Sequence, residues 1–199
     1  MKREEKYNPD DLLKPANMIR IYAQGAFPMA DDDGDIHWYF PESRTLILLN
    51  NFNVPRSLRQ FMDKSGFEYR YDYDPITVIR NCANRERTWI SEKLIKAYEG
   101  LEKLGHLHSV EVYQNENLVG GLYGISFKGM FIGESMFSKV SQASKSALVK
   151  LLERLKENGF EFLDIQFQTE HLKMFGSIEI SLEEFHDILL KAYTRDVKF

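Results

Sequence analysis

The sequence predicts a mixed α+β fold, and three of its patterns support this class. Residues 67–73 alternate aromatic with charged side chains, which is the two-residue period of a half-buried strand. Residues 107–134 contain three apolar segments separated by tight turns, the pattern of an antiparallel meander. In residues 141–159 the apolar side chains recur at the spacing of an amphipathic helix. Strands and helices are therefore expected to share one core.

The first half of the chain contains shorter elements. Residues 45–49 are an apolar strand candidate, and the acidic residues 31–35 form a polar turn. Asp74 and Pro75 are an N-cap followed by a proline at the first helical position, and Ser91 caps the next helix. The helices expected here span residues 15–24, residues 55–64, the segment after Asp74, and residues 91–104.

The second half of the chain has a regular order of elements. Its expected elements are strands at residues 107–113, 118–127 and 130–134, a helix opened by Ser141, a strand at residues 160–167 and a helix at residues 182–193. Meander, helix, strand, helix is the order of an acyltransferase core of the N-acetyltransferase (GNAT) type. We therefore predict a GNAT-like catalytic domain in residues 65–199, preceded by a small N-terminal α/β region in residues 1–64.

The composition favours a compact chain of moderate acidity. Hydrophobic residues make up 43% of the 199 residues and the formal net charge is −4, so neither disorder nor an extended basic surface is expected. Cys82 is the single cysteine, which excludes an intrachain disulfide and a cysteine-based metal site. The charged residues 1–6 do not fit a signal peptide, and no apolar run is long enough to span a membrane. We expect a cytoplasmic protein with no membrane partner.

Polar residues that interrupt apolar strands are the candidates for chemistry. Glu134 ends an apolar strand, and Asp164 and Gln166 lie two residues apart, so both side chains should leave a strand on one face. A carboxylate in such a setting is costly unless it is paired or solvated. These residues therefore either line a cleft or hold a structural hydrogen-bond network, and the residue pattern alone leaves both interpretations open.

Three further features have a functional and a structural interpretation. His106 and His108 share one strand face but lack a third metal ligand, which favours a structural role. The acidic turn at residues 31–35 lacks the terminal Glu of a calcium loop. Glycines within one strand either relieve crowding or let a ligand approach, and the second interpretation is slightly favoured. These glycines are Gly120, Gly121 and Gly124.

Several motifs occur in a fixed order over residues 17–190. The most distinctive is Gly-Glu-Ser-Met-Phe-Ser at residues 133–138, and Asp164-Ile165-Gln166 follows it. The others lie at residues 22–28, 38–44, 55–58, 88–90, 97–98, 104–112, 118–124 and 143–145, and at His171 and Gly176. In this order the motifs resemble those of the bacterial leucyl/phenylalanyl-tRNA–protein transferases.

The resemblance implies an enzyme, an aminoacyltransferase that moves Leu, Phe or Met from aminoacyl-tRNA to the N-terminal Arg or Lys of an acceptor protein. The acceptor is thereby marked for degradation by the N-end rule. Its partners would be the 3′ end of the aminoacyl-tRNA and an acceptor with a basic N-terminal residue. The ester is already activated, so the enzyme must position it, deprotonate an ammonium and stabilise an oxyanion. No metal, coenzyme A or other cofactor is expected.

The resemblance also implies roles for particular residues. Asp164, Gln166 and Glu134 are the implied catalytic residues. The Gln166 carbonyl accepts a hydrogen bond from the attacking amine, Asp164 orients Gln166, and Glu134 binds the cationic N-terminal residue or the ammonium itself. The proton leaves either through the Asp164–Gln166 pair or through the ribose hydroxyl. The implied substrate-binding residues are Trp89, Tyr98, Tyr22, Trp38, Met130, Ser135, Met136, Phe137 and Ile165.

The chain departs from the family pattern at positions that bear on the donor. Met29 stands where the family has Trp after the Phe-Pro pair, Trp38-Tyr39-Phe40-Pro41 replaces Trp-Trp-Ser-Pro, and Ile165 replaces a frequent Cys. An acyltransferase that uses coenzyme A is disfavoured, because the loop before Ser141 lacks a Gly-rich pyrophosphate pattern. The alternative is a non-catalytic module that binds basic protein N-termini or tRNA 3′ ends.

Overall fold

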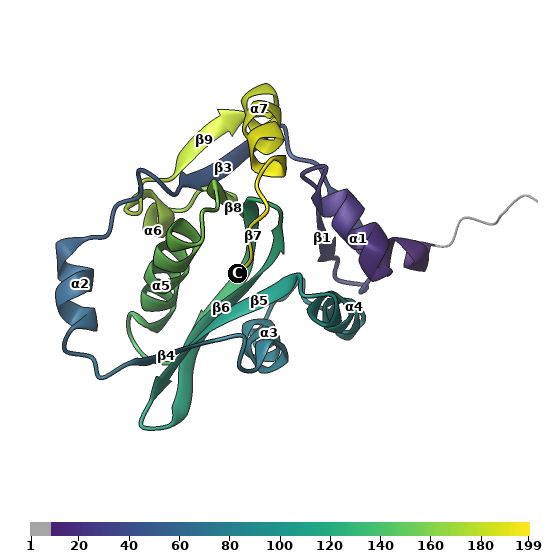
Figure 1. The fold of residues 1–199 in the computed structure, drawn as a ribbon. Coiled ribbons are helices and arrows are strands. Elements are labelled where there is room, and N and C mark those ends of the chain that lie inside the picture. The colour runs from purple at the N-terminus through teal and green to yellow at the C-terminus, as the bar shows by residue number, and fades with distance from the viewer. Residues whose placement is uncertain (1–8) are drawn as a thin grey trace, which may run out of the picture.

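Two β-sheets organise the protein. A computed structural model describes residues 9–199, so the charged residues 1–6 lie outside the described chain. One sheet has seven strands in the order β4-β5-β6-β7-β8-β3-β9, and a separate hairpin consists of β1 and β2. Helices pack on both faces of the large sheet (Figure 1). The predicted mixed α+β class is confirmed.

The centre of the large sheet is the predicted antiparallel meander. Its strands are β5 (Leu107–Gln114), β6 (Asn117–Phe127) and β7 (Met130–Ser138). Helix α5 (Ala143–Glu157) then crosses over to β8 (Phe162–Gln166), which pairs parallel to β7. Strand β4 (Glu68–Tyr71) pairs with β5 and forms one edge of the sheet.

The N-terminal part of the chain contributes one strand to the large sheet. Strand β3 (Ser43–Leu48) lies inside the large sheet, between β8 and β9 (Ile178–Ser181). The elements outside that sheet at the N-terminal end are η1 (Pro9–Leu13), α1 (Pro15–Tyr22), β1 (Phe27–Ala30) and β2 (Ile36–Tyr39). The hairpin is not predictable from period-two patterning, because each strand has four residues and β1 contains a proline.

Two apolar cores lie on opposite faces of the large sheet. One contains residues of α1, α3 (Pro75–Ala83), α4 (Glu92–Lys103) and α7 (Leu182–Tyr193). The other contains residues of α5 and α2 (Arg56–Met62), and the short helix α6 (Glu170–Lys173) packs beside it. The predicted caps are confirmed, since Asp74 accepts the Thr77 N–H at 3.0 Å and Ser91 accepts the Leu94 N–H at 3.3 Å. Among residues 9–199, no helix has the length and apolar content needed to cross a membrane.

The start of α5 differs from the prediction. The helix begins at Ala143 after Gln142, whose φ of 66° is left-handed, so Ser141 does not open it. Instead, the Oγ of Ser138 at the end of β7 accepts the Ser144 N–H at 3.0 Å. The helix is therefore capped from the neighbouring strand, a contact that local sequence cannot reveal.

The glycines of β6 relieve crowding, so the interpretation that they admit a ligand is wrong. A Cβ on Gly120 would lie 2.5 Å from the Cβ of Ala143 in α5. A Cβ on Gly124 would lie 2.2 Å from the carbonyl oxygen of Ile132 in the adjacent strand. Both positions face protein atoms at distances that real side chains do not adopt.

We expect Gly124→Ala to lower the free energy of unfolding by about 1–3 kcal/mol, because the methyl group overpacks a fixed strand backbone. Urea denaturation followed by circular dichroism measures this change. Gly133→Ala is the matched control, since a Cβ there meets its nearest atoms at 3.5 Å, an ordinary contact. Equal stability of the two variants would contradict the crowding explanation.

Candidate active site

A cavity opens where the parallel strands β7 and β8 separate. Their pairing runs only from Met130 with Phe162 to Ile132 with Asp164. Beyond that point, residues 133–136 of β7 and the end of β8 line a cavity of about 330 Å³. A bulge lies at the same place: Gly124 pairs with Gly133 and Tyr123 with Ser135, so Glu134 is the extra residue. β-Bulges of this kind re-aim a side chain out of the regular strand pattern.

Half of the predicted site residues line this cavity. The predicted residues in its wall are Trp89, Glu134, Ser135, Met136, Ile165 and Gln166. Met29 of β1 forms part of the same wall, which places the departure from the family pattern directly at the site. The remainder of the wall is mainly aliphatic, with Leu122, Leu148, Leu151, Leu163 and Leu172. The cavity thus combines an apolar floor with few polar groups, as is usual for small-molecule sites.

Glu134 supplies a carboxyl group to the cavity. Its Oε2 accepts a hydrogen bond from the Tyr98 hydroxyl at 3.2 Å, while Oε1 has no hydrogen-bond partner among residues 9–199. Burial raises the pKa of Glu134 from 4.5 to about 7, and the hydrogen bonds of Tyr22 and Tyr98 oppose this rise. A carboxyl group with a pKa near 7 can take or give a proton at physiological pH.

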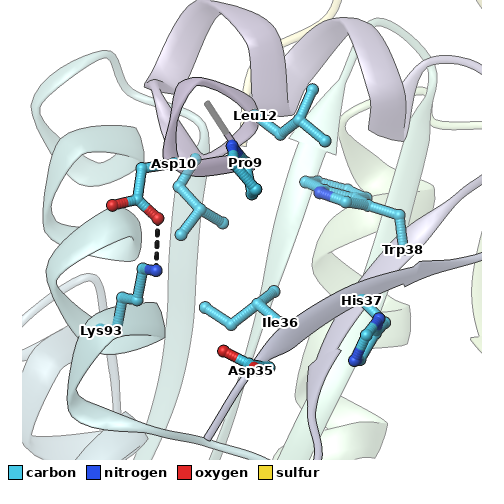
Figure 2. A pocket seen from close by; sticks show the side chains of 9 residues that line it. Pro9, Asp10, Leu12, Asp35, Ile36, His37, Trp38 and Lys93 are labelled. Atoms are coloured by element: carbon cyan, nitrogen blue, oxygen red, sulfur yellow. Dashed lines mark ion pairs between the residues drawn. The ribbon is translucent and has the colours of Figure 1, made fainter. Parts of the chain in front are cut away.

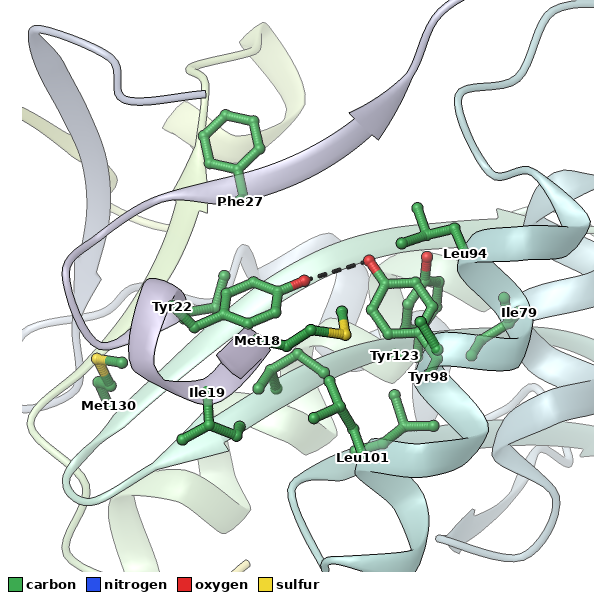
Figure 3. Close-up of a cluster of buried hydrophobic side chains, with 14 of the residues drawn as sticks. Met18, Ile19, Tyr22, Phe27, Ile79, Leu94, Tyr98, Leu101, Tyr123 and Met130 are labelled. Carbon is green, nitrogen blue, oxygen red and sulfur yellow. Dashed lines mark hydrogen bonds between the residues drawn. The ribbon is translucent and has the colours of Figure 1, made fainter. Parts of the chain in front are cut away.

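Three buried tyrosines, Tyr22, Tyr98 and Tyr123, lie close together in the core (Figure 3), and Tyr98 is the one that binds Glu134. The Tyr22 and Tyr98 hydroxyls lie 3.2 Å apart, and the rings of Tyr98 and Tyr123 meet edge to face at 5.5 Å. Burial and the Glu134 charge raise the pKa of Tyr22 and Tyr98 well above 10, so both stay neutral and can donate hydrogen bonds. Tyr22 and Tyr98 were predicted to bind substrate, yet neither lines the cavity and both are fully buried.

Asp164 is held by Arg44, which the sequence analysis does not single out. The Arg44 Nη2 donates to Asp164 Oδ2, and Nη1 donates to the Gly25 carbonyl at 2.5 Å. The guanidinium also lies 5.3 Å from the centre of the Phe27 ring and 5.0 Å from that of Phe185. Both charged groups are 1% exposed, so Asp164 does not reach the cavity. The position of Arg44 directly before an apolar strand was the available sequence signal.

Gln166 ends β8 in a strained conformation and lines the cavity. Its φ is 62°, which is uncommon for a residue with a side chain, and its backbone N–H donates to Asp164 Oδ1 at 2.9 Å. A bulge at Ile165 separates the two residues in the pairing with β3. Asp164 therefore orients Gln166 through the backbone. Within the described chain, the side-chain Nε2 of Gln166 is buried and has no hydrogen-bond partner.

Three predicted substrate-binding residues lie elsewhere. Trp38 packs edge-on against Tyr22 at 5.5 Å and lines a separate cavity of about 460 Å³ beside the Lys93–Asp10 ion pair (Figure 2). Met130 is buried in the core, and Phe137 packs on the face that α3 and α4 cover. Neither lines the cavity at Glu134. The bulge at Glu134 explains why Phe137 points away from the cavity, because the extra residue reverses the faces to which the following residues of β7 point.

Arg85 is a further cavity residue and supplies a cation at the rim. Its Nη2 donates to Ser135 Oγ at 2.9 Å, and its Nε donates to the Cys82 carbonyl at 2.7 Å. Burial raises the pKa of the Cys82 thiol to about 12, so this cysteine remains an unreactive thiol.

The two histidines belong to a hydrogen-bond network away from the cavity. His108 lies between Asp72 and Ser126, with Nδ1 2.8 Å from the carboxylate and Nε2 2.9 Å from the hydroxyl. His106 Nδ1 donates to the Ser126 carbonyl at 2.9 Å. In the part of the chain that the structure describes, no three His, Cys, Asp or Glu side chains are arranged to hold a metal ion. The structural interpretation of this pair is therefore supported.

A cavity with an apolar floor and with a carboxyl and an amide group in its wall has the composition of a small-molecule or enzyme site. The family model of leucyl/phenylalanyl-tRNA protein transferase matches residues 46–190, and the model of that protein's N-terminal domain matches residues 11–42. The chain belongs to the leucyl/phenylalanyl-tRNA–protein transferase family.

Two relatives called leucyl/phenylalanyl-tRNA–protein transferase are similar over nearly the whole chain. The protein of Salinibacter ruber is 45% identical over 185 residues, which cover 92% of this chain and 81% of the relative. That of Herpetosiphon aurantiacus is 46% identical over 181 residues, which cover 90% and 94%. Among solved structures, L-PGS from Bacillus licheniformis is 11% identical with a TM-score of 0.46, covering 78% of this chain and 57% of that chain. This last likeness is too low to assign a shared fold.

We expect Arg44→Met to lower the free energy of unfolding by about 3–5 kcal/mol, because it leaves the Asp164 carboxylate buried without a partner. Urea denaturation at pH 7 measures the loss. The double variant Arg44→Met/Asp164→Asn should recover much of it, since it removes the isolated charge. A double variant no more stable than the single one would show that the ion pair does not hold this region.

The raised pKa of Glu134 predicts a pH-dependent stability. Between about pH 4.5 and 7 the folded protein keeps a proton that the unfolded chain has lost, so the free energy of unfolding falls as pH rises through this window. Relative to Glu134→Gln, the wild-type protein should lose about 3 kcal/mol across it. Parallel denaturation curves at pH 4.5, 6 and 7.5 measure the difference. A difference that is constant with pH would refute the assignment.

Proposed function

We propose that this protein transfers an aminoacyl group from the 3′ end of an aminoacyl-tRNA to the N-terminal residue of an acceptor protein. Leu, Phe or Met is the transferred residue and Arg or Lys the acceptor, which is thereby marked for degradation by the N-end rule. Membership of the transferase family supports this reaction. The observation that carries it is the cavity that brings unpartnered Glu134 and Gln166 atoms together above an apolar floor. A cytoplasmic location, where charged tRNA is found, goes with this function.

We further propose that the catalytic part is a GNAT-like core. The meander β5–β6–β7, the crossover helix α5 and the parallel strand β8 support this assignment. The small N-terminal region of the proposal comprises residues 1–64. One family model ends at residue 42, just before β3, and the other begins at residue 46, within that strand. This region contributes Met29 to the cavity wall and Gly25 to the Arg44 network.

The aliphatic floor is proposed to hold the side chain of the transferred residue. Met136 and Ile165 lie on it with the leucines of α5 and β8. A volume of about 330 Å³ is at the lower end of the range for small-molecule sites, which suits one large apolar side chain and its ester group. Trp89 and Met29, which also line the cavity, are proposed to contact the terminal adenine, for which stacking on an aromatic ring contributes about 1–3 kcal/mol.

Glu134 is proposed to deprotonate the acceptor. The acceptor's N-terminal amine arrives as an ammonium, and Oε1 of Glu134 takes one of its protons. The neutral nitrogen then attacks the ester carbonyl carbon. The proton shed by that nitrogen goes to the departing ribose oxygen, and Glu134 returns its proton to solvent. A carboxyl pKa near 7 suits this exchange, because the group is partly ionised when the acceptor arrives.

Gln166 is proposed to hold the reacting groups, and Asp164 to position Gln166. The Gln166 amide offers its carbonyl to the attacking amine and its unpartnered Nε2 to the developing oxyanion. Asp164 acts on Gln166 through the backbone, since one of its carboxylate oxygens binds Arg44 and the other binds the Gln166 N–H. It is therefore a positioning residue and not a group that touches substrate.

Transfer of radiolabelled Leu, Phe and Met from charged tRNA to a peptide with N-terminal Arg tests the function. We expect transfer by the wild-type protein and a fall in kcat of about 100-fold or more for Glu134→Gln and Gln166→Ala. In the wild-type protein kcat should rise with pH through an apparent pKa near 7, and Glu134→Gln should lose this limb. If the folded protein binds tRNA or peptide but transfers from no donor, the non-catalytic module takes the place of the enzyme.

A further inference from the structure

One face of the β1–β2 hairpin continues the wall of the cavity outward. Phe27 and Tyr39 are directly opposite in the hairpin, so their side chains share a face. Met29, two residues along from Phe27, lies on that same face and lines the cavity. The opposite face carries Trp38, which packs against Tyr22. The hairpin face that contains Met29 therefore continues from the cavity wall through Phe27 to Tyr39.

Two exposed aromatic rings flank the rim at this point. Phe27 is buried and stacks on Tyr39 with ring centres 6.1 Å apart, and it meets Phe167 edge to face at 5.7 Å. Tyr39 is 42% exposed and Phe167 is 57% exposed. Phe167 directly follows Gln166 and lines the cavity. We call Tyr39 and Phe167 the rim rings.

We propose that the rim rings stack the bases of the nucleotides that precede the 3′ adenosine of the donor tRNA. The inference rests on the proposed function, which places the terminal adenosine ester in the cavity. A single strand leaving the cavity passes over its rim, where exposed aromatic rings are a sequence-tolerant platform because every base has a π-face. Phe27 beneath them keeps the two rings in place.

The charges on the hairpin indicate the direction in which the single-stranded RNA leaves the cavity. The turn between β1 and β2 contains four aspartates, and its Asp31 accepts the N–H groups of Asp33 and Asp35. This turn lies at the Ala30–Ile36 end of the hairpin, and Tyr39 lies at the other end, roughly 10 Å away. Phosphates are repelled from the acidic end, so the RNA leaves across the rim rings.

Two donors that differ in length test the proposal. One is aminoacyl-adenosine and the other is the aminoacylated trinucleotide cytidylyl-cytidylyl-adenosine. We expect Tyr39→Ala to raise the KM of the trinucleotide donor about tenfold relative to that of aminoacyl-adenosine, the effect of losing one stacked base. Tyr39→Phe should keep the wild-type ratio, because it keeps the ring. Phe167→Ala should shift the ratio in the same direction.

Tyr73→Ala is the matched control, since Tyr73 is 65% exposed and lies just after β4, at the other edge of the large sheet. It should leave the ratio of the two KM values unchanged. If Tyr39→Ala and Phe167→Ala also leave that ratio unchanged while both donors are used, the rim rings do not bind RNA and the proposal is overturned. If the wild-type protein uses neither donor, the proposed function itself fails and the inference fails with it.

Discussion

The geometry of the site depends on the buried ion pair between Arg44 and Asp164. It joins segments far apart in sequence: Arg44 lies near the start of β3, Asp164 lies in β8, and the guanidinium also binds the Gly25 carbonyl ahead of the hairpin. Burying two charges is costly, and here the cost is offset by the additional hydrogen bonds and by the Phe27 and Phe185 rings. The same carboxylate fixes the Gln166 backbone, so the position of the amide in the cavity follows from this pair.

The pair also separates the roles of the two carboxylates. Asp164 is neutralised by Arg44 and points away from the cavity, whereas Glu134 has no cationic hydrogen-bond partner within residues 9–199 and is bound by Tyr98. Burial then raises the Glu134 pKa to about 7, with the Asp164 charge adding to the rise and Arg44 opposing it. A buried carboxyl group with a raised pKa is a usual candidate for acid–base chemistry in enzymes. In this chain Arg44 is bound to Asp164, and Glu134 therefore has no cationic hydrogen-bond partner among residues 9–199.

Local sequence patterns predicted the regular helices and strands. They did not predict the features whose structure depends on tertiary contacts. Residues 182–193 form α7 at the predicted bounds, and the cap at Asp74 is present, since periodicity and capping are local properties. The hairpin, the Ser138 cap of α5 and the insertion of β3 into the large sheet depend on pairing partners distant in sequence. Glu134 and Gln166 were found because polar groups interrupt apolar strands. Arg44 was missed because its position beside an apolar strand does not show by itself whether the side chain points into the core.

Met29, which stands where the family has Trp, lies on the same hairpin face as Tyr39. The substitution therefore bears on the aromatic rim as well as on the cavity. A methionine in the cavity wall is flexible and polarisable, and it contacts a base without the rigid plane of an indole. Trp89 remains as the aromatic wall of the cavity, while Tyr39 and Phe167 provide further ring surface just outside it. If stacking contributes about 1–3 kcal/mol per base, binding lost at the terminal adenine is recoverable from the preceding nucleotides. On our proposal the chain discriminates among donors more by the single-stranded end as a whole than by the adenine alone.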